Sequence, residues 1–248
     1  CNLVSFLPDN PFDSSRSKFT AMNLPYFDFI LSCDDVWIQN IKNIAPNASV
    51  HKVIVGYNQN DFFPVDKDNI IQKEIENFNC DVSFTGAGYS ELAEGAYRSL
   101  ILNHISEYNL KIWSNDDWSF RFKYYPKLKD KFIGKRLSYE ELRTLYLLST
   151  INLNMPSPQI ITTFQSRTFE IAACKGFQII DYRLDVNKFF NSDELVSFNG
   201  IEDLKEKINY FINNRDSRMS YINNLYNKVV TKHTWDIRIK EYLDLIKY

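Results

Sequence analysis

The chain has 248 residues, a formal net charge of −2 and 44% hydrophobic residues, which is enough to bury one large core or two modest ones. The near-balanced charge argues against a nucleic-acid-binding protein, because such a protein needs a basic face to displace counterions. No apolar run is long enough to span a bilayer, and the opening residues lack the basic start of a signal peptide.

The cysteines and histidines form no metal or redox motif. Cys1, Cys33, Cys80 and Cys174 lie far apart, and no two of them have the spacing of metal ligands or of a redox pair. The three histidines are scattered as well. We therefore expect reduced thiols in a cytoplasmic protein and no bound metal.

Short apolar runs recur along the chain, and most are continuous rather than alternating. Continuous runs predict strands that are covered on both faces, as in a parallel sheet. In chain order these runs occupy residues 3–7, 27–31, 50–55, 81–85, 110–113, 131–134, 151–155, 177–181 and 194–198.

Helical periodicity separates several of these runs. It predicts helices over 92–106, 139–148 and 167–175, with Gly176 as a left-handed C-cap of the last one. From about residue 201 onward the pattern is helical, with breaks near Arg215 and His233. The alternation of strands and helices predicts a doubly wound α/β fold.

A polar stretch at residues 56–76 contains Gly, Pro and several Asp and Asn residues. Such a composition is typical of a connection between two α/β units. Ahead of it lie only three predicted strands, too few for a complete Rossmann-like domain. We therefore expect that the front of the first domain is missing from this sequence.

Two segments of the second half resemble consecutive parts of GT-B glycosyltransferases. The sequence FIGKRLSYEELRTLYLLSTINLNMPSP (132–158) is similar to a strand with a glycine loop, a helix with an "EL…LY" pattern, and a strand that ends in Pro-Ser. The sequence SRTFEIAACKGFQIID (166–181) resembles the segment that follows, in which a Glu begins the pattern "E-A-x-A-x-G".

Other segments extend the resemblance in the correct order. VIVGYNQNDFFP (53–64) resembles the signature where the N-terminal domain hands over to the C-terminal one, and HTWDIRIKEYLDLI (233–246) is similar to the closing helix. GAGYSELAEGAYRSL (86–100), WSNDDW (113–118) and the spacing to SRTFE point to the CgeB-like, spore-maturation-type branch.

The resemblance implies an α/β fold of the GT-B type, in which a Rossmann-like parallel sheet carries helices on both faces beside a partial N-terminal α/β domain. We expect an acceptor-side domain at residues 1–62, a linker at 63–76, a nucleotide-sugar-binding domain at 77–232, and a closing helix at 233–248 that packs back on the N-terminal part.

The activity implied is that of a metal-independent, hexosyltransferase-like enzyme. It would move a sugar from a nucleoside-diphosphate donor, UDP-linked or another, to a glycan, a lipid-linked sugar or a protein. No cofactor beyond the donor is implied. The location expected is the cytoplasm, with the inner face of the membrane as an alternative.

The helix expected from residue 167 carries the first group of donor-site residues. The resemblance places the ribose-binding carboxylate at Glu170, where it would accept hydrogen bonds from the two ribose hydroxyls. Ser166 and Thr168 would offer backbone N–H groups to the diphosphate, and Arg167 a guanidinium. The alternatives are a first-turn charge for Glu170, capping for Ser166 and Thr168, and a surface ion pair for Arg167.

Two loops, and the helix that follows the first of them, carry the second group. Gly86 and Gly88 let the backbone approach a ligand closely, and Arg98 matches an arginine of the CgeB-like pattern. Lys135 and Arg136 lie in the loop that borders the base in the family. The alternatives are an ordinary turn at the glycines, a solvated Arg98 and a basic loop in water.

Asp116 and Asp117 raise the question of a metal. The metal-binding Asp-x-Asp motif belongs to the other large glycosyltransferase fold, whereas GT-B members stabilise the leaving diphosphate with helix dipoles and basic side chains. We therefore predict a turn at these aspartates. Trp113 and Trp118, which flank them, are predicted to be packing aromatics.

One departure from the family concerns the donor sugar. Many retaining members carry an acid eight positions before the ribose-binding Glu, where this chain has Thr162. Stereochemistry and donor sugar are therefore left open. Asp9 and Asp13 are the available candidates for a catalytic base in the N-terminal part, although a turn is the better explanation of both.

Two other functions fit the same architecture. A nucleotide-sugar epimerase would need acids and bases that face the sugar from both domains, and the sequence contains no such constellation. An inactive glycosyltransferase-like structural or assembly component is favoured by Thr162. It is disfavoured by the retained Glu170, Arg167 and glycine loops.

Overall fold

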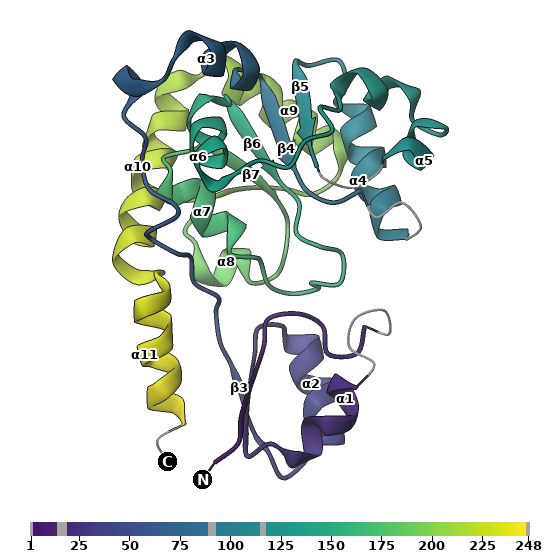
Figure 1. The fold of residues 1–248 in the computed structure, drawn as a ribbon, viewed down its shortest axis with the longest axis vertical. Coiled ribbons are helices and arrows are strands. Elements are labelled where there is room, and N and C mark those ends of the chain that lie inside the picture. The colour runs from purple at the N-terminus through teal and green to yellow at the C-terminus, as the bar shows by residue number, and fades with distance from the viewer. Residues whose placement is uncertain (1, 14–18, 89–92, 115–117, 247–248) are drawn as a thin grey trace.

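A computed structural model describes residues 2–13, 19–88, 93–114 and 118–246, and it contains two separate parallel sheets (Figure 1). The three-stranded sheet has the order β1-β2-β3 and consists of β1 (Val4–Leu7), β2 (Phe29–Ser32) and β3 (Ser49–Lys52). The five-stranded sheet has the order β5-β4-β6-β7-β8, with β4 (Val82–Thr85), β5 (Leu110–Trp113), β6 (Ile151–Asn154), β7 (Gln178–Asp181) and β8 (Val196–Phe198). The predicted α/β class is confirmed.

The helices follow the strands along the chain. Beside the three-stranded sheet lie α1 (Thr20–Asn23), the 3-10 helix η1 (Leu24–Tyr26) and α2 (Asp35–Ile44). The second part of the chain contains η2 (Lys67–Asn69), α3 (Gln72–Phe78), α4 (Ala93–His104), α5 (Ser119–Phe122), η3 (Pro126–Lys131), α6 (Tyr139–Leu148), α7 (Arg167–Ala173), α8 (Val186–Phe189), α9 (Ile201–Asn213), α10 (Arg215–Lys232) and α11 (Trp235–Leu245). None of these described helices is long and apolar enough to cross a bilayer.

Helices cover both faces of the five-stranded sheet. Successive side chains of a strand point to opposite faces, and on β7 Ile179 packs in a cluster with α4 and α9. Its neighbour Ile180 packs in another cluster with α7 and α10. The continuous apolar runs of the sequence therefore reflect strands that are buried from both sides, as predicted.

One of the predicted strands is wrong. Residues 131–134 form only an isolated bridge, between Phe132 and Ile112, and η3 occupies the residues before it. The Phe132 ring packs 5.8 Å from Trp118 and 5.6 Å from Phe122, measured between ring centroids. The run is apolar because this loop covers the core, and Gly134, with φ 66°, turns the chain away.

The predicted glycine C-cap is also wrong. Helix α7 ends at Ala173, and the left-handed residue is Lys175, with φ 57°, rather than Gly176. A side chain at Gly176 would place its Cβ 2.7 Å from the carbonyl oxygen of Tyr146. Glycine is therefore favoured at this position because two backbone segments approach each other closely.

The C-terminal helix joins the two sheets. The Tyr57 N–H donates to the His233 carbonyl at 3.1 Å, and the Trp235 N–H donates to the Tyr57 carbonyl at 3.0 Å. From there α11 runs alongside the three-stranded part (Figure 1). The Tyr242 hydroxyl donates to the Ile54 carbonyl, and its ring lies 5.5 Å from that of Phe6.

Candidate functional site

A pocket of about 430 Å³ opens at the carboxyl ends of β4 and β5. In the strand order, the chain moves from β4 to β5 on one side and then to β6 on the other. An open parallel sheet binds ligands at the carboxyl ends of its strands, beside such a switch. The lining residues are Asn58, Asp61, Phe62, Thr85, Gly86, Ala87, Trp113, Ser114, Lys135, Arg136, Leu137, Tyr139, Leu142, Arg167, Glu170 and Trp235.

Arg167 and Glu170 enter the pocket from α7. The Arg167 Nη1 donates to the Thr85 carbonyl at 2.6 Å, which ties α7 to the end of β4. Its buried Nε has no hydrogen-bond partner among the described residues. Burial raises the pKa of Glu170 above its ordinary value, while the Arg167 charge and a hydrogen bond with Ser166 oppose the rise. A ligand could use both the Glu170 carboxylate and the unsatisfied guanidinium N–H.

Ser166 and Thr168 do not line this pocket. Thr168 is fully buried, and its Oγ1 accepts a hydrogen bond from Asn154 at 3.0 Å. The N–H of Thr168 donates to Gln165 at 3.0 Å, so it is not the unbonded amide that we expected. Ser166 has helical backbone angles and makes no side-chain cap. Its contact with the Glu170 carboxyl is its link to the pocket.

The loop after β4 contains the two glycines. Gly86 lines the pocket, and a Cβ there would lie 2.8 Å from the ring of Phe84. Gly88 lies outside the lining, and a Cβ there would lie 2.6 Å from Nε1 of Trp118. Trp118 is fully buried, as expected of a packing aromatic. The second glycine therefore lets the loop lie flat on this indole.

Arg98 holds two loops together through its buried guanidinium group. It is 3% exposed and does not line the pocket, so it is not the solvated side chain of the alternative interpretation. Its Nη1 donates to the Ala87 carbonyl and its Nη2 to the Met155 carbonyl, both at 2.9 Å. One guanidinium thus holds the loop after β4 against the loop after β6.

Lys135 and Arg136 both line the pocket. Lys135 forms an ion pair with Glu141, and its hydrogen bond lowers the pKa of that carboxyl. Glu141 also completes a capping box with Ser138 at the start of α6. Arg136 is exposed and has no hydrogen bond or ion pair within the described part of the chain. Its guanidinium is therefore available to a ligand.

Several lining residues were not predicted as site residues. Asn58 donates to the Asp61 carboxylate at 2.6 Å, and Arg143 donates to the Asp61 carbonyl at 2.8 Å. Asn58 and Asp61 belong to the motif GYNQNDFFP (56–64), whose composition predicts a connection; its polar side chains are the sequence signal that could have indicated a site. Trp235 reaches the pocket from α11, far away in the sequence. No local pattern links it to the site.

Among the remaining sequence candidates that the structure describes, Trp113 lines the pocket and Asp13 does not. Asp116 and Asp117 fall outside the described residues, so the turn predicted there stays a prediction. Trp113 is 4% exposed and packs on Phe78, with 6.0 Å between ring centroids, while its edge reaches the pocket. After β1, Asp13 donates its N–H to the Asn10 carbonyl at 3.3 Å, which is consistent with the turn interpretation.

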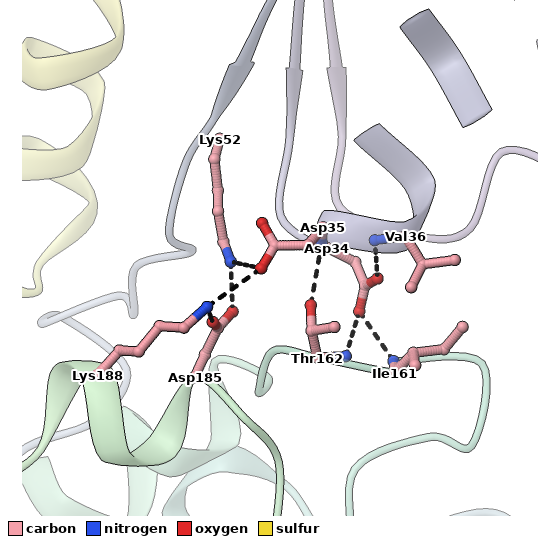
Figure 2. A network of polar contacts seen from close by, with 8 residues as sticks. All are labelled: Asp34, Asp35, Val36, Lys52, Ile161, Thr162, Asp185 and Lys188. Carbon is pink, nitrogen blue, oxygen red and sulfur yellow. Dashed lines mark hydrogen bonds and ion pairs between the residues drawn. The ribbon is translucent and has the colours of Figure 1, made fainter. Parts of the chain in front are cut away.

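Thr162 lies in a polar network between the two sheets, and Figure 2 shows this network. The Asp34 carboxylate, which is fully buried, accepts the N–H groups of Ile161 at 2.8 Å and Thr162 at 2.7 Å. The Thr162 hydroxyl in turn accepts the Asp35 N–H at 3.0 Å. Its carbonyl accepts the Asp185 N–H at 2.8 Å. The N–H, the hydroxyl oxygen and the carbonyl of Thr162 are therefore all hydrogen-bonded within this network.

Charged side chains surround the same contact. Lys52 of β3 lies 2.7 Å from a carboxylate oxygen of Asp35 and 2.7 Å from one of Asp185 (Figure 2). Lys188 of α8 lies 3.0 Å from Asp185 and 3.3 Å from Asp35. The buried Asp185 thus has a cation from each side, which offsets the cost of burying its charge.

Comparisons with known proteins agree with this architecture. A family described as "Glycosyl transferase-like" matches residues 97–244, more than half of the chain. The spore protein CgeB of Bacillus subtilis (strain 168) is 36% identical over 74 residues, which are 30% of this chain and 22% of CgeB. The predicted resemblance to the CgeB-like branch is confirmed.

Solved structures share the fold. Anabaena Alr3699/HepE, in complex with UDP and glucose, has a TM-score of 0.69 at 11% identity, over 100% of this chain and 72% of that one. Sucrose-phosphate synthase from Thermosynechococcus elongatus has a TM-score of 0.68 at 11% identity, over 98% of this chain and 66% of that one. This likeness confirms the predicted GT-B type, and the chain spans only about two thirds of these structures.

Proposed function

Because the chain belongs to the glycosyl transferase-like family, we propose that it is a glycosyltransferase whose nucleotide-sugar donor binds in the pocket at the ends of β4 and β5. The observation that carries the proposal is the convergence of Glu170 and Arg167 from α7 on this pocket, which the basic loop that contains Arg136 also lines. One carboxylate and two guanidinium groups match the ribose hydroxyls and the diphosphate of such a donor.

Each group has a separate role in this proposal. The Glu170 carboxylate accepts hydrogen bonds from the ribose hydroxyls, for which it must be ionised. The Nε of Arg167 donates to a phosphate oxygen, which would satisfy a buried N–H that otherwise has no described partner. Arg136 and Lys135 border the base or the diphosphate. Gly86 allows the backbone to approach the ligand.

UDP is the nucleotide that we expect first, because Anabaena Alr3699/HepE has been solved with UDP. The basic side chains Lys135, Arg136 and Arg167 would stabilise the leaving diphosphate without a metal ion. The acceptor is a glycan, a lipid-linked sugar or a protein. We further propose the domain limits given by the sequence, with residues 77–232 holding the donor and residues 1–62 facing the acceptor across the linker 63–76.

One observation favours a second candidate, an inactive structural component of the same fold. Thr162 stands where many retaining members carry an acid, and its backbone and hydroxyl are bonded to Asp34, Asp35 and Asp185. Because threonine has no carboxylate, this position cannot supply one to the donor sugar. Transfer in the proposed enzyme would proceed without an acid at this place.

Calorimetric titration with UDP, GDP, TDP and CDP in the absence of metal tests the donor site. We expect one diphosphate to bind and Glu170→Gln to weaken binding by about 1.5–3 kcal/mol, the cost of losing a hydrogen bond to a charged group. Glu140→Gln, on the exposed start of α6, is the matched control and should bind as the wild type does. Release of sugar from the matching donor then separates an enzyme from an inactive component, since only the enzyme hydrolyses or transfers it.

A further inference from the structure

A second cavity, of about 290 Å³, lies at the opposite edge of the five-stranded sheet. Thr150 in its wall directly precedes β6, and Phe177 directly precedes β7. Because the strands are parallel, this is the amino-end edge of the sheet. The pocket proposed for the donor lies at the carboxyl-end edge. The two sites are therefore separate.

Four basic residues line this cavity, and they come from three elements. Lys67 belongs to η2, Lys175 to the turn after α7, and Arg215 and Arg218 to the start of α10. Among the lining residues that the structure describes there is no Asp or Glu. Concave basic surfaces attract anions, because low-dielectric walls focus the field of like charges.

These cations lack the acidic partners that other basic residues of the chain have. Lys207 pairs with Asp203 at 2.6 Å, and Lys228 pairs with Glu194 at 2.5 Å. By contrast, the described structure contains no ion pair of Lys67, Lys175, Arg215 or Arg218.

Arg218 is half-buried beside Arg215, close to the end of α9. Its Nη1 donates to the carbonyls of Ile212, at 3.0 Å, and Phe211 at the end of α9. Burial, followed by the nearby charge of Arg215, lowers the pKa of Arg218. An anion between the two guanidinium groups would turn this repulsion into attraction.

The backbone at Lys175 is a second and independent sign. Lys175 has φ 57°, a left-handed conformation that is unfavourable for a non-glycine residue. Its ammonium lies 4.9 Å from the centroid of the Tyr226 ring, which holds the amine against α10. The chain thus keeps a lysine where glycine would be less strained. Such strained residues are often found at functional sites.

We propose that this cavity binds a phosphate group, with Lys67, Lys175, Arg215 and Arg218 as its cationic rim. The phosphate belongs either to a free phosphorylated molecule or to the headgroup of an anionic lipid. The remaining lining is largely apolar and leaves recognition to the basic residues; its apolar members are Leu147, Leu148, Phe177, Met219 and Ile222. The proposal goes beyond the donor site and does not depend on it.

The test is a calorimetric titration of the full chain with inorganic pyrophosphate, in which the binding that substitutions in this cavity remove is assigned to the cavity. We expect binding that Lys175→Gly and Arg215→Gln each weaken about tenfold, because each removes a charged hydrogen bond. Lys175→Gly removes the amine at a position where glycine relieves backbone strain, so a loss of binding cannot come from misfolding. Lys240→Gln, an exposed residue of α11, is the matched control and should bind as the wild type does.

A flotation assay distinguishes the two sources, with phosphatidylcholine vesicles that contain or lack phosphatidic acid. Flotation that requires phosphatidic acid, and that Lys175→Gly abolishes, assigns a lipid headgroup. Pyrophosphate binding without flotation assigns a free phosphorylated molecule. Equal pyrophosphate binding by the wild type and Lys175→Gly, or no binding in either assay, would overturn the proposal. A chain that binds pyrophosphate here but binds no nucleotide would refute only the donor proposal.

Discussion

The Asp34 carboxylate accepts the N–H of Thr162 at 2.7 Å across 128 residues of sequence. Asp34 follows β2 in the three-stranded part, and Thr162 lies in the loop between β6 and α7 of the five-stranded part. The same carboxylate caps α2 through the Val36 N–H at 3.0 Å. One buried side chain therefore starts a helix, joins the two sheets and fixes the loop that leads to Arg167 and Glu170.

Removing this carboxylate should cost much of the stability of the chain. Asp34→Ala leaves the N–H groups of Ile161 and Thr162 without their acceptor, and each buried, unsatisfied donor costs about 1–3 kcal/mol. Urea unfolding measures the loss. Asp66→Ala is the matched control, because the Asp66 carboxylate caps the exposed η2 through the Asp68 N–H and accepts from the exposed Asn69 side chain, both close in sequence. Equal losses in the two variants would show that the contact between the sheets adds nothing.

Glu170 should lower the stability of the fold and raise the affinity for the nucleotide. Its folded pKa is raised, so the ionised form is penalised at neutral pH, and this penalty disappears as pH falls below the ordinary pKa of a glutamate. Glu170→Gln should therefore unfold at higher urea concentration than the wild type at neutral pH, while its affinity for the nucleotide falls. A variant that is both less stable and unchanged in affinity would contradict the assigned role.

The same shift predicts how binding depends on pH. A protonated Glu170 loses acceptor capacity toward the ribose hydroxyls. Affinity for the nucleotide should decline at mildly acidic pH, where ordinary glutamates are still ionised, and Glu170→Gln should lose this part of the pH dependence. Titrations at several pH values decide the point. Parallel declines in the wild type and the variant would mean that another group titrates.

His233 should make the fold sensitive to acid. Burial, followed by the nearby charge of Arg238, lowers its pKa from 6.5 to about 3, and its ring stacks on Phe169 at 4.4 Å. Below pH 6.5 the unfolded chain takes up a proton that the folded chain rejects, so stability falls until about pH 3. Between pH 7 and pH 5 the wild type should lose about 1–2 kcal/mol more than His233→Gln. Equal losses in urea unfolding would contradict a neutral, buried ring.

The turn after α7 should respond oppositely to two neighbouring substitutions. Lys175→Gly removes left-handed strain and should stabilise the chain by about 1 kcal/mol. Gly176→Ala should destabilise it by about 1–3 kcal/mol, because the new Cβ would meet the Tyr146 carbonyl oxygen at 2.7 Å. Thermal unfolding of both variants checks the signs. A stabilising Gly176→Ala would mean that Tyr146 and its helix move aside easily.

Local chemistry explains which parts could be predicted from sequence. Helix α6 spans Tyr139–Leu148, the range predicted, because its apolar periodicity is clear and Ser138 and Glu141 form a capping box. Buried strands were found from their apolar runs, and the same rule failed at residues 131–134, where the loop around Phe132 is apolar for packing. An apolar run indicates that its residues are buried, and residues of a loop can be buried as well.

Contacts between distant segments could not be predicted. Nothing near Asp34 indicates that it binds amides 127 and 128 residues away. Family resemblance singled out Glu170, but it could not show that the Arg98 guanidinium binds the carbonyls of Ala87 and Met155. A side chain's type suggests what it can bind, and only the fold determines which partner reaches it first.

A crystal structure of the chain with UDP tests the central claim most directly. The account predicts UDP in the pocket at the ends of β4 and β5, with both ribose hydroxyls within hydrogen-bond distance of Glu170 and a phosphate oxygen near the Nε of Arg167. UDP bound elsewhere, or bound in this pocket with its ribose away from Glu170, would contradict the account.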